Sequence, residues 1–170
     1  MKYQSDSSKH QIPIVVGVTG HRDLREEDVP ELKKKFEAIF KEIKHKYKPL
    51  IKTFGGKCKY QYPPIKILSP LAEGADRLMA RVGLHAGHAE VKLIAILPMP
   101  KEEYEKDFDT AESKRESADL LEKAEDVFEL PFIEGNTLEK VQTCKESRNK
   151  QYALVGTYIA AHSQILIALW

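Results

Sequence analysis

Hydrophobic positions along this chain follow two periods, one typical of buried strands and one typical of amphipathic helices. Ile14–Val18 is an apolar, β-branched run without strict alternation, which predicts a strand buried on both faces, as in a parallel sheet. Apolar runs at Ile65–Leu68 and Val91–Leu97 predict two further strands. We expect Val127–Leu130 to form an edge strand and Gln164–Trp170 to form the last strand.

The segments between these strands carry apolar residues at helical spacing. In the first of them, Asp28 and Glu31 form a capping-box pattern at a helix start. We expect this helix to end at Pro49 and at the Gly55-Gly56 pair. Further helices are expected over residues 75–86, 101–108, 112–123 and 148–162. The polar residues 135–145 are expected to form a mobile loop, and residues 57–64 a surface loop or short hairpin.

The order of these elements determines the expected architecture. Strands alternate with helices, and right-handed crossovers in that order produce a mostly parallel sheet with helices on both faces, which is an α/β fold. The polar residues 1–11 are expected to form a flexible lead-in, and residues 12–170 one domain.

The helix expected over 148–162 differs from the others because almost every position from Tyr152 to Ala161 is apolar or small. A helix that is apolar all round must be covered on both sides. The sheet can cover one side. We expect the other side to contact a second subunit, as a homodimer, or a later region of a longer protein.

Composition narrows the class of protein. The chain has 170 residues, 42% of them hydrophobic, and a net charge of +1, so no global charge argument favours nucleic acid or an anionic membrane. No apolar run is long enough to cross a bilayer, and no signal segment opens the chain. Cys58 and Cys144 are isolated, so reduced thiols and a cytoplasmic location are expected.

Candidate chemistry lies in the loops that follow strands. Thr19–Arg22, Ser69–Asp76 and whatever follows Trp170 would meet at one sheet edge, where open α/β sheets bind ligands. The second of these loops leads into a helix amino terminus, which favours an anion such as phosphate. Gly20 and Gly74 would let a ligand approach the backbone closely. Arg22, Arg77 and Arg148 are candidate phosphate clamps, since a guanidinium matches phosphate oxygens.

Each of these residues also has a purely structural interpretation. Gly20 could serve only the turn, Gly74 only the helix entry, and Arg22 could form a salt bridge with an acid of the second loop. Glu73 and Asp76 lie one loop away from His21, which suggests acid–base chemistry.

For Asp76 we favour a cap on the first helical turn, and we leave the role of Glu73 open. His85 and His88 lack third and fourth ligands, so no metal site and no cofactor are expected.

Three motifs together carry a resemblance to a known family. They are Gly17-Val18-Thr19-Gly20-His21-Arg22, Ser69-Pro70-Leu71-Ala72-Glu73-Gly74-Ala75-Asp76-Arg77, and Arg148-Asn149-Lys150-Gln151-Tyr152 leading to Ile165–Trp170. With them the chain resembles the SLOG superfamily. Its members are related to the lonely-guy phosphoribohydrolases (lysine decarboxylase-like proteins), DNA-processing protein A and the cytosolic sensor domain of melastatin-type TRP channels.

The resemblance implies a Rossmann-like three-layer α/β/α domain with a mostly parallel five-stranded sheet, in which the last strand lies beside the first. It also implies a site for a nucleotide or nucleotide-derived ligand. By position the ligand-binding residues would be Gly17, Thr19, Gly20, His21, Arg22, Ser69, Glu73, Gly74, Asp76 and Arg148. In the phosphoribohydrolases the arginine matched by Arg148 lies beside the phosphoribosyl group.

The phosphoribohydrolases carry a Pro-Gly-Gly-x-Gly-Thr-x-x-Glu run directly after the strand that here ends at Trp170, and this chain lacks it. We therefore expect a nucleotide-binding sensor domain, the N-terminal part of a longer protein, rather than an enzyme. One alternative is an N-glycosidic hydrolase of nucleoside monophosphates in which Glu73 assists. Another is single-stranded DNA binding, against which the near-zero net charge argues.

Overall fold

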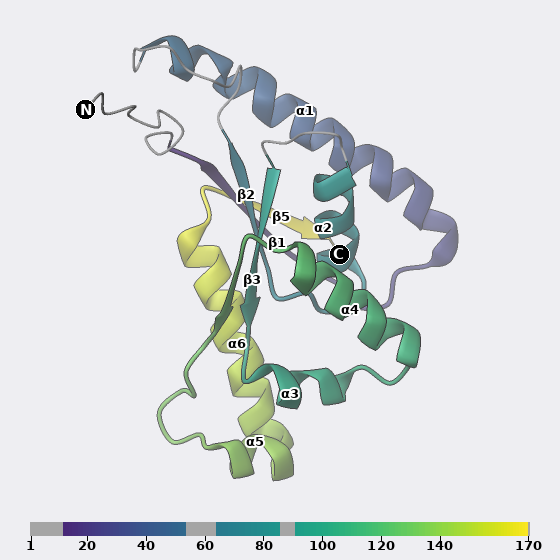
Figure 1. The fold of residues 1–170 in the computed structure, drawn as a ribbon, viewed down its shortest axis with the longest axis vertical. Helices are drawn as coiled ribbons and strands as arrows, with labels where there is room; N and C mark the ends of the chain where they lie inside the picture. The colour runs from purple at the N-terminus through teal and green to yellow at the C-terminus, as the bar shows by residue number, and fades with distance from the viewer. Residues whose placement is uncertain (1–11, 54–63, 86–90, 170) are drawn as a thin grey trace, which may run out of the picture.

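The computed structural model of the chain (Figure 1) describes residues 12–53, 64–85 and 91–169. The expected lead-in, residues 1–11, and residues 57–63 of the expected loop or hairpin lie outside the described residues. One five-stranded sheet is formed, in the order β4-β3-β2-β1-β5, and every neighbouring pair is parallel. Its strands are β1 (Ile14–Gly20), β2 (Ile65–Ser69), β3 (Val91–Leu97), β4 (Asp126–Glu129) and β5 (Ile165–Leu169).

Both outer strands expected from the sequence are present, and the last strand lies beside the first. Val16 of β1 is in register with Ile67 of β2 on one side and with Ile165 of β5 on the other. Strand order therefore reverses direction between β1 and β5. In open α/β sheets a ligand crevice forms at the carboxyl ends of the strands that flank such a reversal.

The helices cover the two faces of the sheet unequally. They are α1 (Val29–Thr53), α2 (Ala75–His85), α3 (Lys101–Tyr104), α4 (Ala111–Lys123), α5 (Leu138–Thr143) and α6 (Lys145–His162). Figure 1 shows α1, α2 and α4 on one side of the sheet and α6 on the other. The fold is thus a three-layer α/β arrangement with a Rossmann-like topology, as expected, and its sheet is entirely parallel.

One hydrophobic core lies on each side of the sheet, between the sheet and the helices that cover it. The larger core joins Val16 and Ile67 of the sheet to Phe40 of α1, all with at most 1% of their surface exposed. The smaller core joins Leu68 of β2 to Val155 of α6. Because successive strand residues point to opposite faces, the neighbours Ile67 and Leu68 serve different cores. Each such buried side chain stabilises the fold by about 1.5–3 kcal/mol.

The expectation of a loop over residues 135–145 is wrong, because α5 forms within it. The hydroxyl of Thr137 accepts a hydrogen bond from the Lys140 amide (3.2 Å), which caps the helix start. Val141 is 1% exposed and anchors this short helix to the larger core. A single buried valine in a polar segment produces little helical periodicity, which is why the pattern suggested a loop.

Two helix boundaries also differ from the expected ones. Helix α1 continues through Pro49 to Thr53, because a proline removes only one helical hydrogen bond and its cost can be offset by the rest of a long helix. Helix α6 begins at Lys145 rather than at Arg148. The Gly55-Gly56 pair lies outside the described residues.

Helix α6 contacts the sheet along one side only. Gln151, Val155 and Ile159 are buried, whereas Ala153 and Ala160 are exposed. Coverage of that second side by another subunit or by a later region stays a prediction. None of the helices in the described ranges is long and apolar enough to cross a bilayer.

Candidate functional site

The loops after β1 and β2 meet at the carboxyl edge of the sheet. The Ala75 amide, at the start of α2, donates to the His21 carbonyl (3.1 Å), and the His21 amide donates to the Leu169 carbonyl of β5 (3.1 Å). Gly74 has a φ of +81°, and a Cβ atom at this position would collide with the carbonyl oxygens of His21 and Arg22. The carboxyl ends of β1, β2 and β5 and the loops that follow β1 and β2 are therefore held together at one edge of the sheet, which we call the rim.

The expected glycines make close approaches within the protein itself. A Cβ atom on Gly20 would lie 2.7 Å from the Cβ of Ala75 and 2.7 Å from the carbonyl oxygen of Leu169. Gly17 lies under α6, where an added Cβ atom would be 2.7 Å from the Ile159 side chain. Gly20 and Gly74 thus let the loops interlock, and Gly17 lets α6 pack on β1.

The loop after β2 is held by hydrogen bonds and contains one strained residue. Leu71 has a φ of 57°, in the left-handed region that a leucine rarely adopts, and its side chain is fully buried. The Ser69 hydroxyl accepts from the Leu71 amide (3.1 Å), and the Leu71 carbonyl accepts from Arg77 Nε (2.9 Å). Such a conformation costs about 1–3 kcal/mol and is found most often at functional sites. Burial of the leucine offsets this cost.

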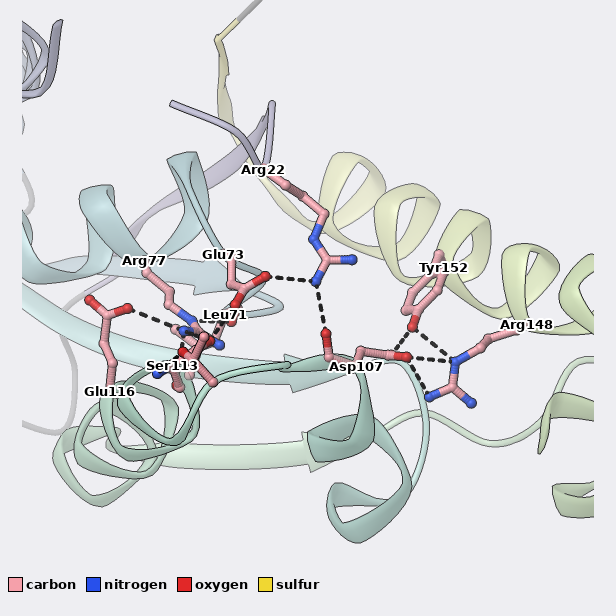
Figure 2. Close-up of polar contacts among 10 residues, drawn as sticks. Arg22, Leu71, Glu73, Arg77, Asp107, Ser113, Glu116, Arg148 and Tyr152 are labelled. Carbon is pink, nitrogen blue, oxygen red and sulfur yellow. Dashed lines mark hydrogen bonds and ion pairs between the residues drawn. The ribbon is translucent and has the colours of Figure 1, made fainter. Parts of the chain in front are cut away.

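Arg22 bridges the two loops, as Figure 2 shows. Its Nη2 donates to Glu73 Oε2 (3.1 Å) and to the Asp107 carbonyl (3.4 Å). The Arg22 and Glu73 side chains are 47% and 35% exposed, and an ion pair this exposed stabilises a protein by at most about 1 kcal/mol. The other Glu73 oxygen accepts from the Ser113 hydroxyl. A ligand anion could therefore replace Glu73 as the partner of Arg22 at little cost.

Arg77 is held by the protein on several sides. Its Nη1 donates to the Ser113 hydroxyl (2.8 Å) and to Glu116 (3.1 Å), and its guanidinium lies 4.3 Å from the centre of the Phe108 ring. The side chain is only 1% exposed. It therefore joins α2 to α4 and does not face solvent.

Arg148 has a similar position in a second network (Figure 2). Its Nε donates to Asp107 Oδ1 (3.0 Å), its Nη1 to Glu103 Oε1 (2.9 Å) and its Nη2 to the Glu103 carbonyl (3.0 Å). The Tyr152 hydroxyl donates to the other Asp107 oxygen. Burial opposes ionisation of Glu103, but hydrogen bonds from Lys106, Gln142 and Arg148 outweigh it and lower the Glu103 pKa to about 2.

Asp76 is the most perturbed acid of the rim. Its side chain lies in the first turn of α2, the residue is 7% exposed, and its Oδ1 has no hydrogen-bond partner within the described part of the chain. Burial raises the Asp76 pKa to about 7, although the Ala72 amide and the charges of Arg22 and Arg77 oppose the shift. Near neutral pH this carboxyl therefore exists in both protonation states.

A hollow of about 410 Å³ opens beside this rim, between the ends of β1 and β5 and the start of α1. Its lining is His21, Asp23, Leu24, Arg25, Asp28, Glu31, Leu32, Lys35 and Leu169. Within it Arg25 pairs with Asp28 (2.7 Å), and Lys35 pairs with Glu31 (2.8 Å). Its volume lies within the range of small-molecule sites, about 300–1,000 Å³.

The expected ligand-binding residues lie in different parts of the structure. His21 lines the hollow, while Arg22, Glu73, Gly74 and Asp76 surround the adjoining rim. Thr19 and Ser69 lie at the strand ends beneath them. Gly17 lies apart from the rim, under α6, and Arg148 lies in the Glu103–Asp107 network.

The sequence did not predict two residues that contact the rim, Asp107 and Ser113. Both follow β3, whose carboxyl end lies at the same sheet edge. The parallel order itself was the signal that could have found them. The segment after Leu97 had to begin at this edge, and its acids Glu103 and Asp107 recur at helical spacing.

Comparison with known proteins adds no assignment. No protein-family model matches the chain, and no curated protein sequence matches it. Membership of the SLOG superfamily therefore stays a prediction from the three motifs. Across residues 12–53, 64–85 and 91–169, no group of three or more His, Cys, Asp or Glu side chains is arranged to hold a metal ion.

Proposed function

We propose that this domain binds a nucleotide or a nucleotide-derived phosphorylated ligand at the carboxyl edge of its sheet. The observation that carries the proposal is the hollow beside the reversal of strand order, between β1 and β5. Ligands of open α/β sheets bind at this topological position. A nucleotide-sized molecule fits a site of about 410 Å³.

The chemistry of the lining supports a two-part ligand. Leu24, Leu32 and Leu169 offer apolar surface for a base, and Asp23 offers a carboxylate for sugar hydroxyls. Arg22 follows His21 in the chain but does not line the hollow, and its guanidinium lies at the adjoining rim beside Glu73 and Asp107, where we place the phosphate of the ligand. Within the described part of the chain the hydrogen bonds of that guanidinium come from Nη2, which leaves Nε and Nη1 as donors for phosphate oxygens.

A nucleotide screen by thermal shift tests this proposal. A ligand present at 100 times its Kd stabilises the folded state by about 2.7 kcal/mol, which raises the Tm of a domain of this size by about 5–10 °C. The variant Arg22→Gln should lose most of that rise. Arg115→Gln, which alters an exposed arginine of α4, should retain it. Failure of nucleotides, ADP-ribose and cyclic dinucleotides to raise the Tm would refute the proposal.

The site of binding can be mapped independently. Addition of the best ligand should shift the backbone amide resonances of residues 20–25 and 72–76 in a ¹⁵N NMR spectrum. Shifts confined to α5 and the exposed side of α6 would place the ligand elsewhere and would refute the assignment of the rim.

An N-glycosidic hydrolase remains the second candidate, and Asp76 is the observation that favours it. A buried carboxyl with a pKa of about 7 is suited to general acid catalysis near neutral pH. Incubation with nucleoside monophosphates, followed by chromatography for free base, separates the two functions. Release of base that is lost in Asp76→Asn and retained in Asp119→Asn would favour the hydrolase.

A further inference from the structure

The stretch that forms most of α6 and all of β5 differs from the rest of the chain in charge. All 27 Lys and Arg residues and all 26 Asp and Glu residues lie within residues 1–150, so residues 151–170 contain none of them. Much of this uncharged stretch is nevertheless at the surface. Its exposed residues include Ala153, Gly156, Ala160, Leu166 and Ala168. A contiguous uncharged face on a protein that is otherwise 31% charged is typical of a surface that contacts a partner.

Strand β5 lies at the edge of the sheet but has the composition of an interior strand. Among the described strands its one neighbour is β1, and Ile165–Leu169 is apolar on both faces. Edge strands are usually protected by charged residues, because their unpaired N–H and C=O groups can bind a further strand. The opposite edge follows this rule, since β4 begins with Asp126 and ends with Glu129. The β5 edge lacks this protection.

The uncharged face continues from β5 onto α6. Leu166 lies on the α6 side of the sheet, because a Cβ atom on Gly17 would be 3.1 Å from the Leu166 side chain and 2.7 Å from that of Ile159. Leu166 is 46% exposed, so α6 leaves this side of β5 partly uncovered. The exposed side of β5 and the neighbouring flank of α6 therefore form one surface.

A glycine on that flank of α6 has no role in the packing of the chain on itself. Gln151 faces the segment after β4, because its side-chain amide donates to the Pro131 carbonyl (2.8 Å). Gly156 lies about 140° further around the helix, on the flank that is turned away from β4. A Cβ atom on Gly156 would meet nothing within 4 Å. Glycine is unfavourable inside a helix, so this residue is better explained by the close approach of a second protein surface.

We propose that β5 pairs with β5 of a second copy of this chain, so that the two sheets join into one and the two α6 flanks face each other. A two-fold axis brings identical strand edges together in opposite directions, so the pairing is antiparallel. Charge favours a second copy as the partner. An interface between identical surfaces brings like charges together, and β5 with the α6 flank beside it has none to oppose self-association.

The same pairing at the other edge is disfavoured. An antiparallel β4 pair would bring Asp126 of one copy close to Glu129 of the other, and like charges across a strand pair are destabilising. The inference does not depend on the proposed function, because it requires no ligand.

Size-exclusion chromatography with multi-angle light scattering tests the pairing. The unaltered chain should have twice the monomer mass of 19.4 kDa at about 100 μM, with a Kd below about 10 μM. Leu166→Lys and Ala168→Lys place like charges across the paired edges, so each should raise this Kd at least tenfold. The matched control is Phe128→Lys on β4. Phe128 is 47% exposed and is in register with Ile96, which lies on the α6 side of the sheet, so this variant should remain a dimer.

Hydrogen exchange measured by mass spectrometry gives a second test that needs no variant. The amides of β5 should exchange more slowly at high protein concentration than at low concentration, whereas those of β4 should exchange equally at both. A monomeric mass for the unaltered chain at about 100 μM overturns the inference and leaves this face to a different partner. A dimer that persists in both β5 lysine variants, one that is lost equally in Phe128→Lys, or β5 exchange that does not depend on concentration also overturns it.

Discussion

Replacement of Arg148 by methionine should destabilise the fold strongly. The Arg148 side chain is 16% exposed and the Glu103 side chain 5%, and their Nη1–Oε1 distance is 2.9 Å. Removal of one partner from a buried ion pair costs about 3–5 kcal/mol, because the remaining charge stays buried. Lys106 also contacts Glu103 (2.6 Å), so we expect the lower end of this range, about 3 kcal/mol.

Urea unfolding followed by circular dichroism measures this loss. With an m value of about 2 kcal/mol per M, a loss of about 3 kcal/mol lowers the midpoint by about 1.5 M. A matched control is Lys150→Met on the same helix, because the ion pair that Lys150 forms within the described ranges is a surface pair with Glu146, and both side chains are more than half exposed. This control should change the free energy of unfolding by less than about 0.5 kcal/mol.

A double variant tests the mechanism. If the loss comes from an uncompensated buried charge, Glu103→Gln should recover part of it when combined with Arg148→Met. A loss below about 1 kcal/mol in Arg148→Met, or no recovery in the double variant, would refute the reasoning. Unchanged stability together with lost nucleotide binding would instead favour Arg148 as a direct phosphate ligand.

Three further predictions concern the rim and its acids. Gly74→Ala should destabilise the fold by more than about 1 kcal/mol in urea unfolding, because φ is +81° and the added Cβ would meet the carbonyls of His21 and Arg22; a neutral effect would contradict this packing. The pKa of Glu103 is lowered from 4.5 to about 2, so its ionised form contributes stability above pH 4.5 that is lost as pH falls towards 2. Glu103→Gln should therefore make the Tm less sensitive to acid. An unchanged dependence of the Tm on acid pH would contradict this prediction. Asp76 has the opposite effect on the pH dependence of stability, because its pKa is raised from 3.8 to about 7. The stability that its protonated form contributes is full below pH 3.8 and is lost as pH rises through 7, so Asp76→Asn should become more stable relative to the unaltered protein between pH 5 and pH 8. An equal difference in stability at both pH values would show that the raised pKa is absent.

The arrangement of a parallel sheet between two layers of helices could be predicted from the order of apolar runs in the sequence. Ile14–Val18 and, apart from the exposed Lys92, Val91–Leu97 are apolar on both faces because strands of a parallel sheet are covered on both sides, and this pattern needs no knowledge of distant contacts. The meeting of the segments that contain Thr19 and Glu73 followed from the same pattern, since parallel strands end at one edge of the sheet. Elements anchored by a single buried residue, such as α5 through Val141, left no comparable pattern.

The partners of the polar side chains were decided only by the tertiary structure. Arg148 and Arg22 were both candidate phosphate ligands in the sequence, yet Arg148 lies in a buried network with Glu103, whereas Arg22 is about half exposed and pairs with Glu73 at the rim. Asp76 could be predicted to start α2, but not to be buried with a raised pKa. The buried network of Arg148 and the burial of Asp76 both depend on the segment after β3, which folds back over the rim. A local pattern of residues specifies which side chains a helix or strand presents, whereas desolvation and pairing depend on what another part of the chain places against them.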